Sequence, residues 1–148
     1  RALGNRSILA DPRNSNIKKI INSKIKRRES FRPFAPSVIF EEAHKWFDIN
    51  KEIPFMSEVY QVRKEKQKLL PGITHIDGSG RVQTVKKEDN FKYYNLIRNF
   101  FELTNVPVIL NTSFNENEPI VNHPIEALNC FHRTEMDILV LENYILSR

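Results

Sequence analysis

The sequence predicts an α/β (α+β) fold, with a twisted mixed sheet flanked by helices in a single domain. The chain has 148 residues, which suits one domain with a buried core. Short apolar runs of strand length alternate with segments whose apolar residues recur at helical spacing. The longest apolar runs, at 106–110 and 138–141, are too short to cross a membrane, so we expect no membrane span.

In the first half of the chain, local signals predict short elements. Polar residues 14–16 can cap a helix whose apolar residues follow at helical spacing. Pro33 and Pro36 impose an extended path, because proline removes a donor and biases the preceding residue away from helix. The predicted elements are a helix to residue 23, a strand at 34–40, a helix at 41–47, a strand at 56–62 and a mobile polar loop at 64–72.

The second half contains the clearest helix, at 91–103. Asp89 or Asn90 can cap it, Asn105 suits a left-handed end, and its apolar stripe is expected to face the core. That stripe consists of Phe91, Tyr94, Ile97 and Phe101. The other predicted elements are a strand at 81–85, a buried strand at 106–110, a helix from Pro124 to Phe131 and a last strand at 136–141.

Positive charge is concentrated at the start of the chain. Ten of the 23 lysine and arginine residues lie in residues 1–37, against two of the 18 acidic residues, while the remainder is net acidic. This asymmetry favours an anionic partner (a nucleotide, a phosphate or a nucleic acid), although a solvated basic face explains it equally well. Cys130 is the single cysteine, which excludes an internal disulfide or a cysteine zinc site; a reduced, cytoplasmic setting fits, and we place Cys130 in the core.

Lys26, Arg28 and Arg32 form the first candidate cluster. In an extended segment, side chains two residues apart project together, so Lys26 and Arg28 would share one face. A lysine point charge beside a planar guanidinium suits a polyphosphate. The Lys-x-Arg pattern is common, however, and a solvated face remains the alternative.

The second candidate cluster is the polar run 111–115, which directly follows the buried strand at 106–110. Asn111, Ser113 and Asn115 would present amide and hydroxyl groups where that strand ends, and ligands bind at such strand ends in open α/β sheets. The alternative is a polar turn whose side chains hydrogen-bond their own backbone.

The third cluster lies in the glycine-rich segment 72–81. His75 and Asp77 could contact a carbonyl group or a metal, and Arg81 a phosphate or carboxylate. Two such ligands do not make a metal site, so we assign no metal ligand, and Mg²⁺ arriving with a nucleotide fits better. A plain glycine turn is the alternative. The sequence has no Gly-x-Gly-x-x-Gly motif and no Gly-Lys-Ser/Thr phosphate loop.

Four motifs together resemble a known family. Segments 1–9, 31–38, 81–85 and 111–115 are similar, in order and spacing, to the C-terminal domain of the O-carbamoyltransferases of nodulation-factor and antibiotic biosynthesis. The resemblance covers essentially the whole chain. It implies a YrdC-like domain at 15–148, preceded by a linker at 1–14 from an N-terminal carbamoyl-transfer domain that this sequence does not contain.

The resemblance also implies a reaction. Carbamoyl phosphate is converted to carbamate, which attacks the α-phosphate of ATP to give carbamoyl-adenylate, and the N-terminal domain moves the carbamoyl group to an acceptor sugar hydroxyl. The implied ligands are ATP with Mg²⁺ and carbamoyl phosphate, and a metal ion, iron, is expected only in the N-terminal domain.

The family's Lys-x-Arg and Ser-x-Asn pairs fall on Lys26, Arg28, Ser113 and Asn115. The resemblance implies catalytic roles for Lys26, Arg28, Arg32 and Arg81, and binding roles for Arg1, Thr74, His75, Asp77, Asn111, Ser113 and Asn115. Ser79-Gly80 stands where the family has Thr-Ala, which leaves the role of His75 open. Two alternatives remain: a catalytically silent structural or regulatory domain, and a basic nucleic-acid-binding module. The second is less favoured, because residues 13–28 offer no aromatic stacking platform.

Overall fold

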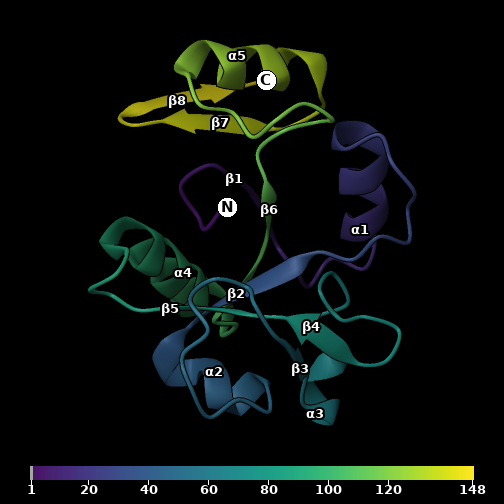
Figure 1. The fold of residues 1–148 in the computed structure, drawn as a ribbon, viewed down its shortest axis with the longest axis vertical. Coiled ribbons are helices and arrows are strands. Elements are labelled where there is room, and N and C mark those ends of the chain that lie inside the picture. Colours follow the sequence, from purple (N-terminus) through teal and green to yellow (C-terminus); the bar gives the residue numbers. More distant parts are fainter. Residues whose placement is uncertain (1) are drawn as a thin grey trace.

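A four-stranded mixed sheet forms the centre of the fold, in the order β1-β6-β2-β5 (Figure 1). The computed structural model describes residues 2–148, so Arg1 lies outside the described residues. Strand β6 pairs antiparallel with both β1 and β2, and β2 pairs parallel with β5. The predicted mixed α/β sheet is confirmed. Its strands are β1 (Ser7–Ala10), β2 (Ala35–Ile39), β5 (Gln83–Val85) and β6 (Val108–Ser113).

Two hairpins and a set of helices surround this sheet. The hairpins pair β3 (Val59–Gln61) with β4 (Ser79–Arg81), and β7 (Ile138–Leu141) with β8 (Tyr144–Ser147). In Figure 1, α5 and β7–β8 lie together at one end of the molecule, and α2, α3 and β3–β4 at the other. The helices are α1 (Ile17–Ile20), which continues into the π-helix η1 (Ile21–Ile25), α2 (Phe40–Trp46), α3 (Lys64–Gln67), α4 (Phe91–Thr104) and α5 (Pro124–Arg133).

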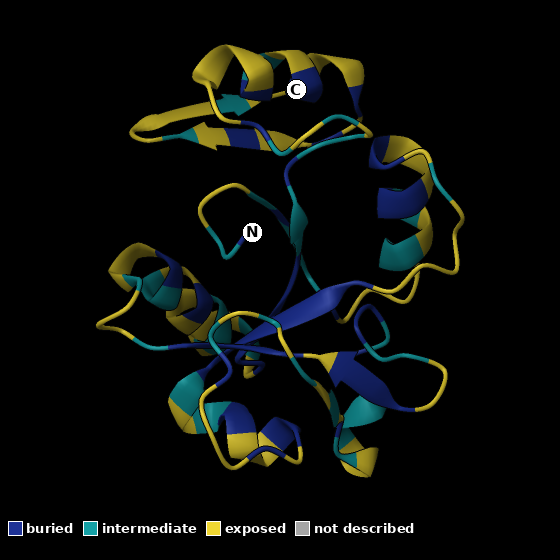
Figure 2. Cartoon of the chain, in the orientation of Figure 1, coloured by how far each residue is buried: buried dark blue, intermediate teal, exposed yellow. Residues whose placement is uncertain are grey.

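Strands β2 and β6 are buried on both faces, and their side chains alternate between two apolar clusters. Val38 and Val108 belong to the larger cluster, which reaches α2 and α5. Ile39 and Ile109 belong to the smaller cluster against α4. Figure 2 shows β2 buried along its length. The polar groups of β2 and β6 are therefore held in a rigid centre.

The predicted caps of helix α4 are confirmed, but its predicted buried apolar stripe is confirmed only in part. The Asn90 side chain accepts a hydrogen bond from the Tyr93 backbone N–H, and Asn105 is left-handed with φ of 59°. Tyr93 and Ile97 are the buried residues, whereas Phe91 is 58% exposed. The prediction that Phe91 faces the core is wrong, since its ring lies 5.7 Å from the Lys87 ammonium, while Tyr94 and Phe101 pack partly buried against the smaller cluster.

Several element boundaries differ from those expected. Strand β1 lies within residues 1–14, where a linker is expected, and pairs with β6 along Ser7–Ala10. The expected loop at 64–72 contains the short helix α3, and β8 was not predicted. No helix within residues 2–148 combines the length and apolar character that a membrane span requires.

Candidate functional site

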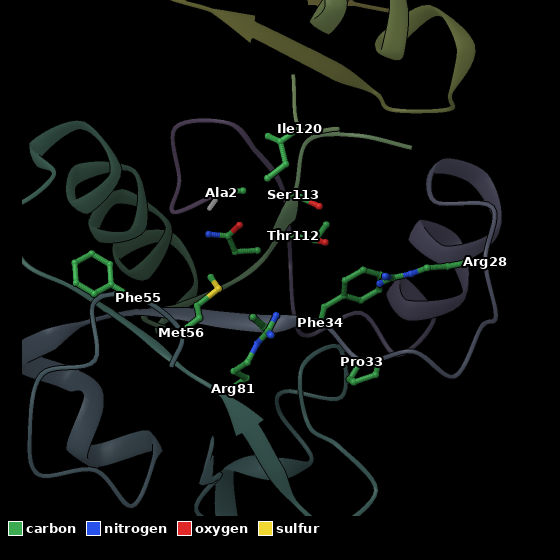
Figure 3. A pocket seen from close by; sticks show the side chains of 12 residues that line it. Ala2, Arg28, Pro33, Phe34, Phe55, Met56, Arg81, Thr112, Ser113 and Ile120 are labelled. Atoms are coloured by element: carbon green, nitrogen blue, oxygen red, sulfur yellow. The ribbon is translucent and has the colours of Figure 1, made fainter. Parts of the chain in front are cut away.

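A cavity of about 340 Å³ opens beside the central strands (Figure 3). Cavities of this size commonly hold small molecules. Figure 3 shows Arg81 entering from below, Arg28 from the right, and Thr112 and Ser113 of β6 above Arg81. Residues from all three candidate clusters therefore meet at one cavity. The lining residues are Ala2, Arg28, Pro33, Phe34, Ala35, Phe55, Met56, Arg81, Asn111, Thr112, Ser113 and Ile120.

Lys26 lies behind this cavity, with a side chain only 3% exposed. Its Nζ donates to the Ser113 carbonyl at 2.5 Å and to the Asn115 carbonyl and Oδ1 at 2.7 Å each, with Ser113 Oγ at 3.2 Å. Burial, followed by the charge of Arg28, lowers the pKa of Lys26 to about 8. We call Lys26, Ser113 and Asn115 the lysine cluster. Since an ammonium group has three protons, these acceptors already saturate it.

The backbone around Lys26 is tightly wound, which contradicts the expected extended segment. Lys26 ends the π-helix η1, and its N–H donates to the Ile21 carbonyl at 2.8 Å. Arg27 then adopts a left-handed conformation with φ of 43°, and the Arg28 N–H returns to the Asn22 carbonyl at 2.9 Å. This turn, and not a shared strand face, lets Lys26 point inward while Arg28 reaches the cavity. π-Helical turns are frequent at functional sites.

Arg28 is held in place and still has donors to offer. Its Nε donates to Asn22 Oδ1 at 2.7 Å, and its guanidinium lies 5.0 Å from the centre of the Phe34 ring. Burial, followed by the charge of Arg32, lowers its pKa. Its two terminal nitrogens have no hydrogen-bond partner among residues 2–148. A planar, oriented fork of this kind suits a phosphate or carboxylate.

Arg81, at the end of β4, is the second cavity arginine. Its side chain has neither a hydrogen-bond nor an ion-pair partner among the described residues, unlike the other arginines there. Strand β4 pairs with β3, which places Arg81 opposite Val59. Two arginines from segments far apart in sequence thus line a cavity that holds no acidic side chain.

Strand β6 carries the polar run into the sheet itself. The prediction that residues 111–115 follow the strand is corrected, because β6 continues to Ser113 and pairs there with Ser7 of β1. Ser113 Oγ donates to Asn115 Oδ1 at 2.6 Å, and Asn115 Nδ2 donates to the Glu118 carbonyl at 2.5 Å. Ser113 lines the cavity, whereas Asn115 is used within the loop.

Asn111 belongs to a buried polar network between the strands and α4. Its Nδ2 lies 3.1 Å from Ser37 Oγ, 3.1 Å from the Tyr93 hydroxyl and 3.3 Å from Gln83 Oε1. Burial raises the pKa of Tyr93, so its phenol stays neutral. Asn111 is 1% exposed, and its Oδ1 is buried without a partner. The network therefore fixes the Asn111 amide through its nitrogen, while its oxygen has no hydrogen-bond donor.

The remaining predicted site residues lie away from the cavity wall. The hydroxyl of Thr74 donates to the Leu70 carbonyl at 2.8 Å. His75 Nδ1 lies 3.2 Å from Ser79 Oγ, which donates to Asp77 Oδ1 at 2.6 Å, so this segment forms a turn closed on itself. Burial lowers the pKa of His75. Arg32 forms an exposed ion pair with Glu29 at 3.3 Å.

An apolar side of the cavity was missed by sequence reasoning. Phe34, Phe55, Met56 and Ile120 line it, and Phe55 is 56% exposed. Met56 has a left-handed backbone with φ of 52°, which is uncommon for a residue without a short polar side chain. An apolar Phe-Met pair directly after Pro54 was the available signal, but the alternation from Met56 predicts a strand at 56–62, of which the structure forms only Val59–Gln61.

Most cations in the basic first quarter of the chain make contacts within the fold. Arg13 pairs with Asp11, Lys24 with Glu135 and Arg27 with Glu116, while Lys18 donates to the Thr74 carbonyl. The charge run is therefore used mostly within the fold. No group of three or more metal-binding side chains occurs within residues 2–148.

The chain matches the protein family described as "Carbamoyltransferase C-terminus" over residues 1–148. An uncharacterized Synechocystis protein, sll1178, is 48% identical over 169 residues, which cover 100% of this chain and 28% of that protein. The nodulation protein NolNO of Sinorhizobium fredii is 47% identical over 152 residues, covering 100% and 22%. The 3'-hydroxymethylcephem-O-carbamoyltransferase of Amycolatopsis lactamdurans is 38% identical over 142 residues, covering 95% and 27%. The chain thus spans about a quarter of the length of these relatives.

Proposed function

The chain belongs to the carbamoyltransferase C-terminus family, as its four motifs predicted, and from this premise we propose that it forms carbamoyl-adenylate from carbamoyl phosphate and ATP. The observation that carries the proposal is the pair Arg28 and Arg81, two arginines with unpartnered donors beside hydroxyl groups in one cavity. One relative is named as an O-carbamoyltransferase. Transfer to an acceptor sugar hydroxyl, by the rest of a longer cytoplasmic protein, is part of the same proposal.

The reaction needs charge neutralisation and alignment more than a protein nucleophile. Carbamoyl phosphate first loses phosphate to water, leaving carbamate. A carbamate oxygen then attacks the α-phosphorus of ATP, the bond between the α-phosphate and the β-phosphate breaks, and pyrophosphate leaves. In the proposal, Arg28 and Arg81 hold the phosphate oxygens of the two substrates, with ATP arriving as its Mg²⁺ complex.

The neighbouring groups would orient the substrates. The Thr112 hydroxyl lines the cavity and can donate to a phosphate oxygen, beside Ser113, whose own hydroxyl donates to Asn115 Oδ1. Phe55 and Met56 supply an apolar surface against which the adenosine part of ATP can pack. The phosphate groups would then contact the polar part of the cavity, and the adenosine part of ATP its apolar part.

Lys26 would act from behind the cavity wall. Its ammonium group is saturated by Ser113 and Asn115, so in the proposal it fixes Ser113 and adds positive potential without touching a phosphate. Arg32, Thr74, His75 and Asp77 remain predictions from the resemblance. Arg32 is close enough to Arg28 to affect its pKa, so it could strengthen the same field.

The test measures pyrophosphate release by the full-length protein with ATP–Mg²⁺, with and without carbamoyl phosphate. We expect release to require carbamoyl phosphate and to fall at least about tenfold in Arg28→Gln, because a charged donor to phosphate is lost. Arg27→Gln is the matched control, since the adjacent Arg27 side chain pairs with Glu116 outside the cavity.

Two results would contradict the proposal. Binding of both substrates without pyrophosphate release would favour the silent structural or regulatory domain. Absence of binding, together with salt-sensitive binding of nucleic acid that follows the number of cations removed, would favour the nucleic-acid module.

A further inference from the structure

The oxygen of the Asn111 amide is an acceptor without a donor. It is the one buried side-chain nitrogen or oxygen among residues 2–148 that lacks a hydrogen-bond partner. Folded proteins rarely leave such a group unsatisfied, and an exception calls for an explanation, such as a ligand. Asn111 also lines the cavity that contains Arg28 and Arg81, so a ligand entering that cavity can supply the missing donor.

The surrounding network determines which end of the amide is left without a partner. Ser37 Oγ donates its proton to Gln83 Oε1 at 2.7 Å, so towards Asn111 both atoms can only accept. The group that faces them must therefore be the Asn111 NH₂, which lies 3.1 Å and 3.3 Å from these oxygens. Tyr93 completes the set at 3.1 Å. A flip would place Oδ1 against Ser37 Oγ and Gln83 Oε1, which have no proton to give it, so Oδ1 is held in its unsatisfied position.

A fixed, recessed acceptor selects a small ligand group that carries N–H. Within carbamoyl phosphate, the phosphate and the carbonyl oxygen accept hydrogen bonds, and the amino group is the part that donates through N–H. The arginines can bind the phosphate end of this molecule, but they cannot distinguish an amino group from a methyl group. An N–H acceptor in the same cavity can make that distinction, because a buried acceptor rejects an analogue that lacks the donor.

We propose that Asn111 Oδ1 accepts a hydrogen bond from the carbamoyl amino group and thereby sets the preference for carbamoyl over acyl substrates. This inference rests on the proposed function. It assigns Asn111 a task separate from that of the arginines, which is to select the transferred group while they hold the phosphates.

The test compares carbamoyl phosphate with acetyl phosphate, in which a methyl group replaces the amino group. Affinities for the full-length protein are measured by calorimetry, so the readout does not depend on turnover. We expect the protein to bind carbamoyl phosphate roughly 10- to 100-fold more tightly than acetyl phosphate. In Asn111→Leu, which keeps a similar volume but removes the acceptor, the ratio should fall to within about threefold.

Ser37→Ala is the matched control. It removes one partner of the Asn111 NH₂ but leaves Tyr93 and Gln83 to hold the amide, so the ratio should stay near that of the unaltered protein. If Asn111→Leu does not fold, equal affinity for the two ligands in the unaltered protein still overturns the proposal.

The outcomes separate the two proposals. Equal affinity for the two ligands in the unaltered protein, or a ratio that survives in Asn111→Leu, overturns the role of Asn111 while leaving the arginine site standing. A variant that loses ATP affinity but keeps the ratio also overturns it, because the acceptor would then serve the adenine amino group. Binding of neither ligand by the folded protein would instead contradict the proposed function.

Discussion

Two polar clusters meet at β6, and they differ in how far their hydrogen bonds are satisfied. In the lysine cluster, the Lys26 ammonium is shared among acceptors of Ser113 and Asn115 and is 3% exposed. On the cavity side, Arg28 has free terminal nitrogens, Arg81 has no hydrogen-bond or ion-pair partner within residues 2–148, and the Asn111 oxygen has no donor. Saturated groups hold a fold together, whereas unsaturated ones remain available to a ligand.

In both the Lys-x-Arg motif and the Ser-x-Asn motif, one residue lines the cavity and the other does not. Lys26 and Asn115 lie off the cavity wall, whereas Arg28 and Ser113 line the cavity, and Ser113 also belongs to the lysine cluster. Residues that a motif groups together thus carry different tasks, because the left-handed turn at Arg27 and the end of β6 at Ser113 send neighbouring side chains in different directions. The four residues should therefore respond differently to substitution.

Replacement of Lys26 should have the largest effect, and on stability. Lys26→Met keeps much of the side-chain volume but removes the donor to the Asn115 carbonyl, whereas the Ser113 carbonyl keeps the Asn115 N–H at 3.1 Å. We expect the free energy of unfolding to fall by about 1–3 kcal/mol, which is the usual cost of leaving one acceptor unsatisfied. Urea unfolding measures the change.

The control for that experiment is Lys24→Met, at a position two residues away. Lys24 forms an exposed ion pair with Glu135, and exposed pairs contribute little, so its unfolding midpoint should hardly move. If both variants unfold at the same urea concentration, Lys26 does not have the structural role described for it, and the contrast between the clusters is lost.

The sequence predicted the elements whose local signals agree with their packing. The long helix with its Asn90 and Asn105 caps and the apolar strand at 106–110 are both present. The misses are elements fixed by distant partners. Strand β1 exists because it pairs with β6, about a hundred residues away, and β8 exists because it pairs with β7; neither has a strong pattern of its own. The charged stretch at 64–67 folds into a helical turn that local polarity does not reveal.

The candidate site was predictable as a set of residues but not as an arrangement. Lys26, Arg28, Ser113 and Asn115 do come together, yet for a reason that periodicity could not supply, since η1 and a left-handed Arg27 replace the expected extended segment. The unsatisfied oxygen of Asn111 depends on Ser37, Gln83 and Tyr93, which lie far apart in sequence. Hydrogen-bond saturation is a property of the folded chain, and no spacing rule contains it.

Replacement of Arg81, a cavity residue, should have the opposite result: ligand binding should weaken while stability is kept. Arg81 makes no internal hydrogen bond or ion pair with a described residue, so Arg81→Gln should leave the unfolding midpoint almost unchanged. Carbamoyl phosphate binding should weaken roughly 10- to 100-fold, because a charged donor to phosphate is removed. Calorimetry on the full-length protein measures this.

Two further arginines complete that experiment. Arg32→Gln should weaken binding less than Arg81→Gln, because Arg32 is paired with Glu29 and lies off the cavity wall. Arg98→Gln, which removes an exposed pair with Glu102 on α4, sets the background level. A larger loss for Arg32 than for Arg81 would mean that partner-free donors do not identify the ligand-binding side.

The burial of Lys26 should also appear in the pH dependence of stability. Its pKa is about 8 in the folded protein against an ordinary 10.5, so between these values the unfolded chain binds more protons and stability rises with pH. Relative to Lys26→Met, the protein should gain about 1 to 2 kcal/mol from pH 8 to 9.5. Taking the difference between the two proteins largely removes the titration of Cys130, whose pKa burial raises to about 11. A flat difference would mean that the ammonium is not desolvated.

The smallest effect should come from the turn at 74–79. Its side chains hydrogen-bond one another, so it belongs with the saturated groups. Burial lowers the pKa of His75, so as the pH falls from 7 to 5.5 the unfolded chain takes up a proton before the folded one does, and stability falls. This loss should be smaller in His75→Gln, as measured by urea midpoints at the two pH values. The same variant should weaken carbamoyl phosphate binding far less than Arg81→Gln, because His75 Nδ1 contacts Ser79 and lies off the cavity wall. A loss of binding as large as that of Arg81→Gln would place His75 at the ligand, and saturation would then no longer separate structural from ligand-binding groups in this domain.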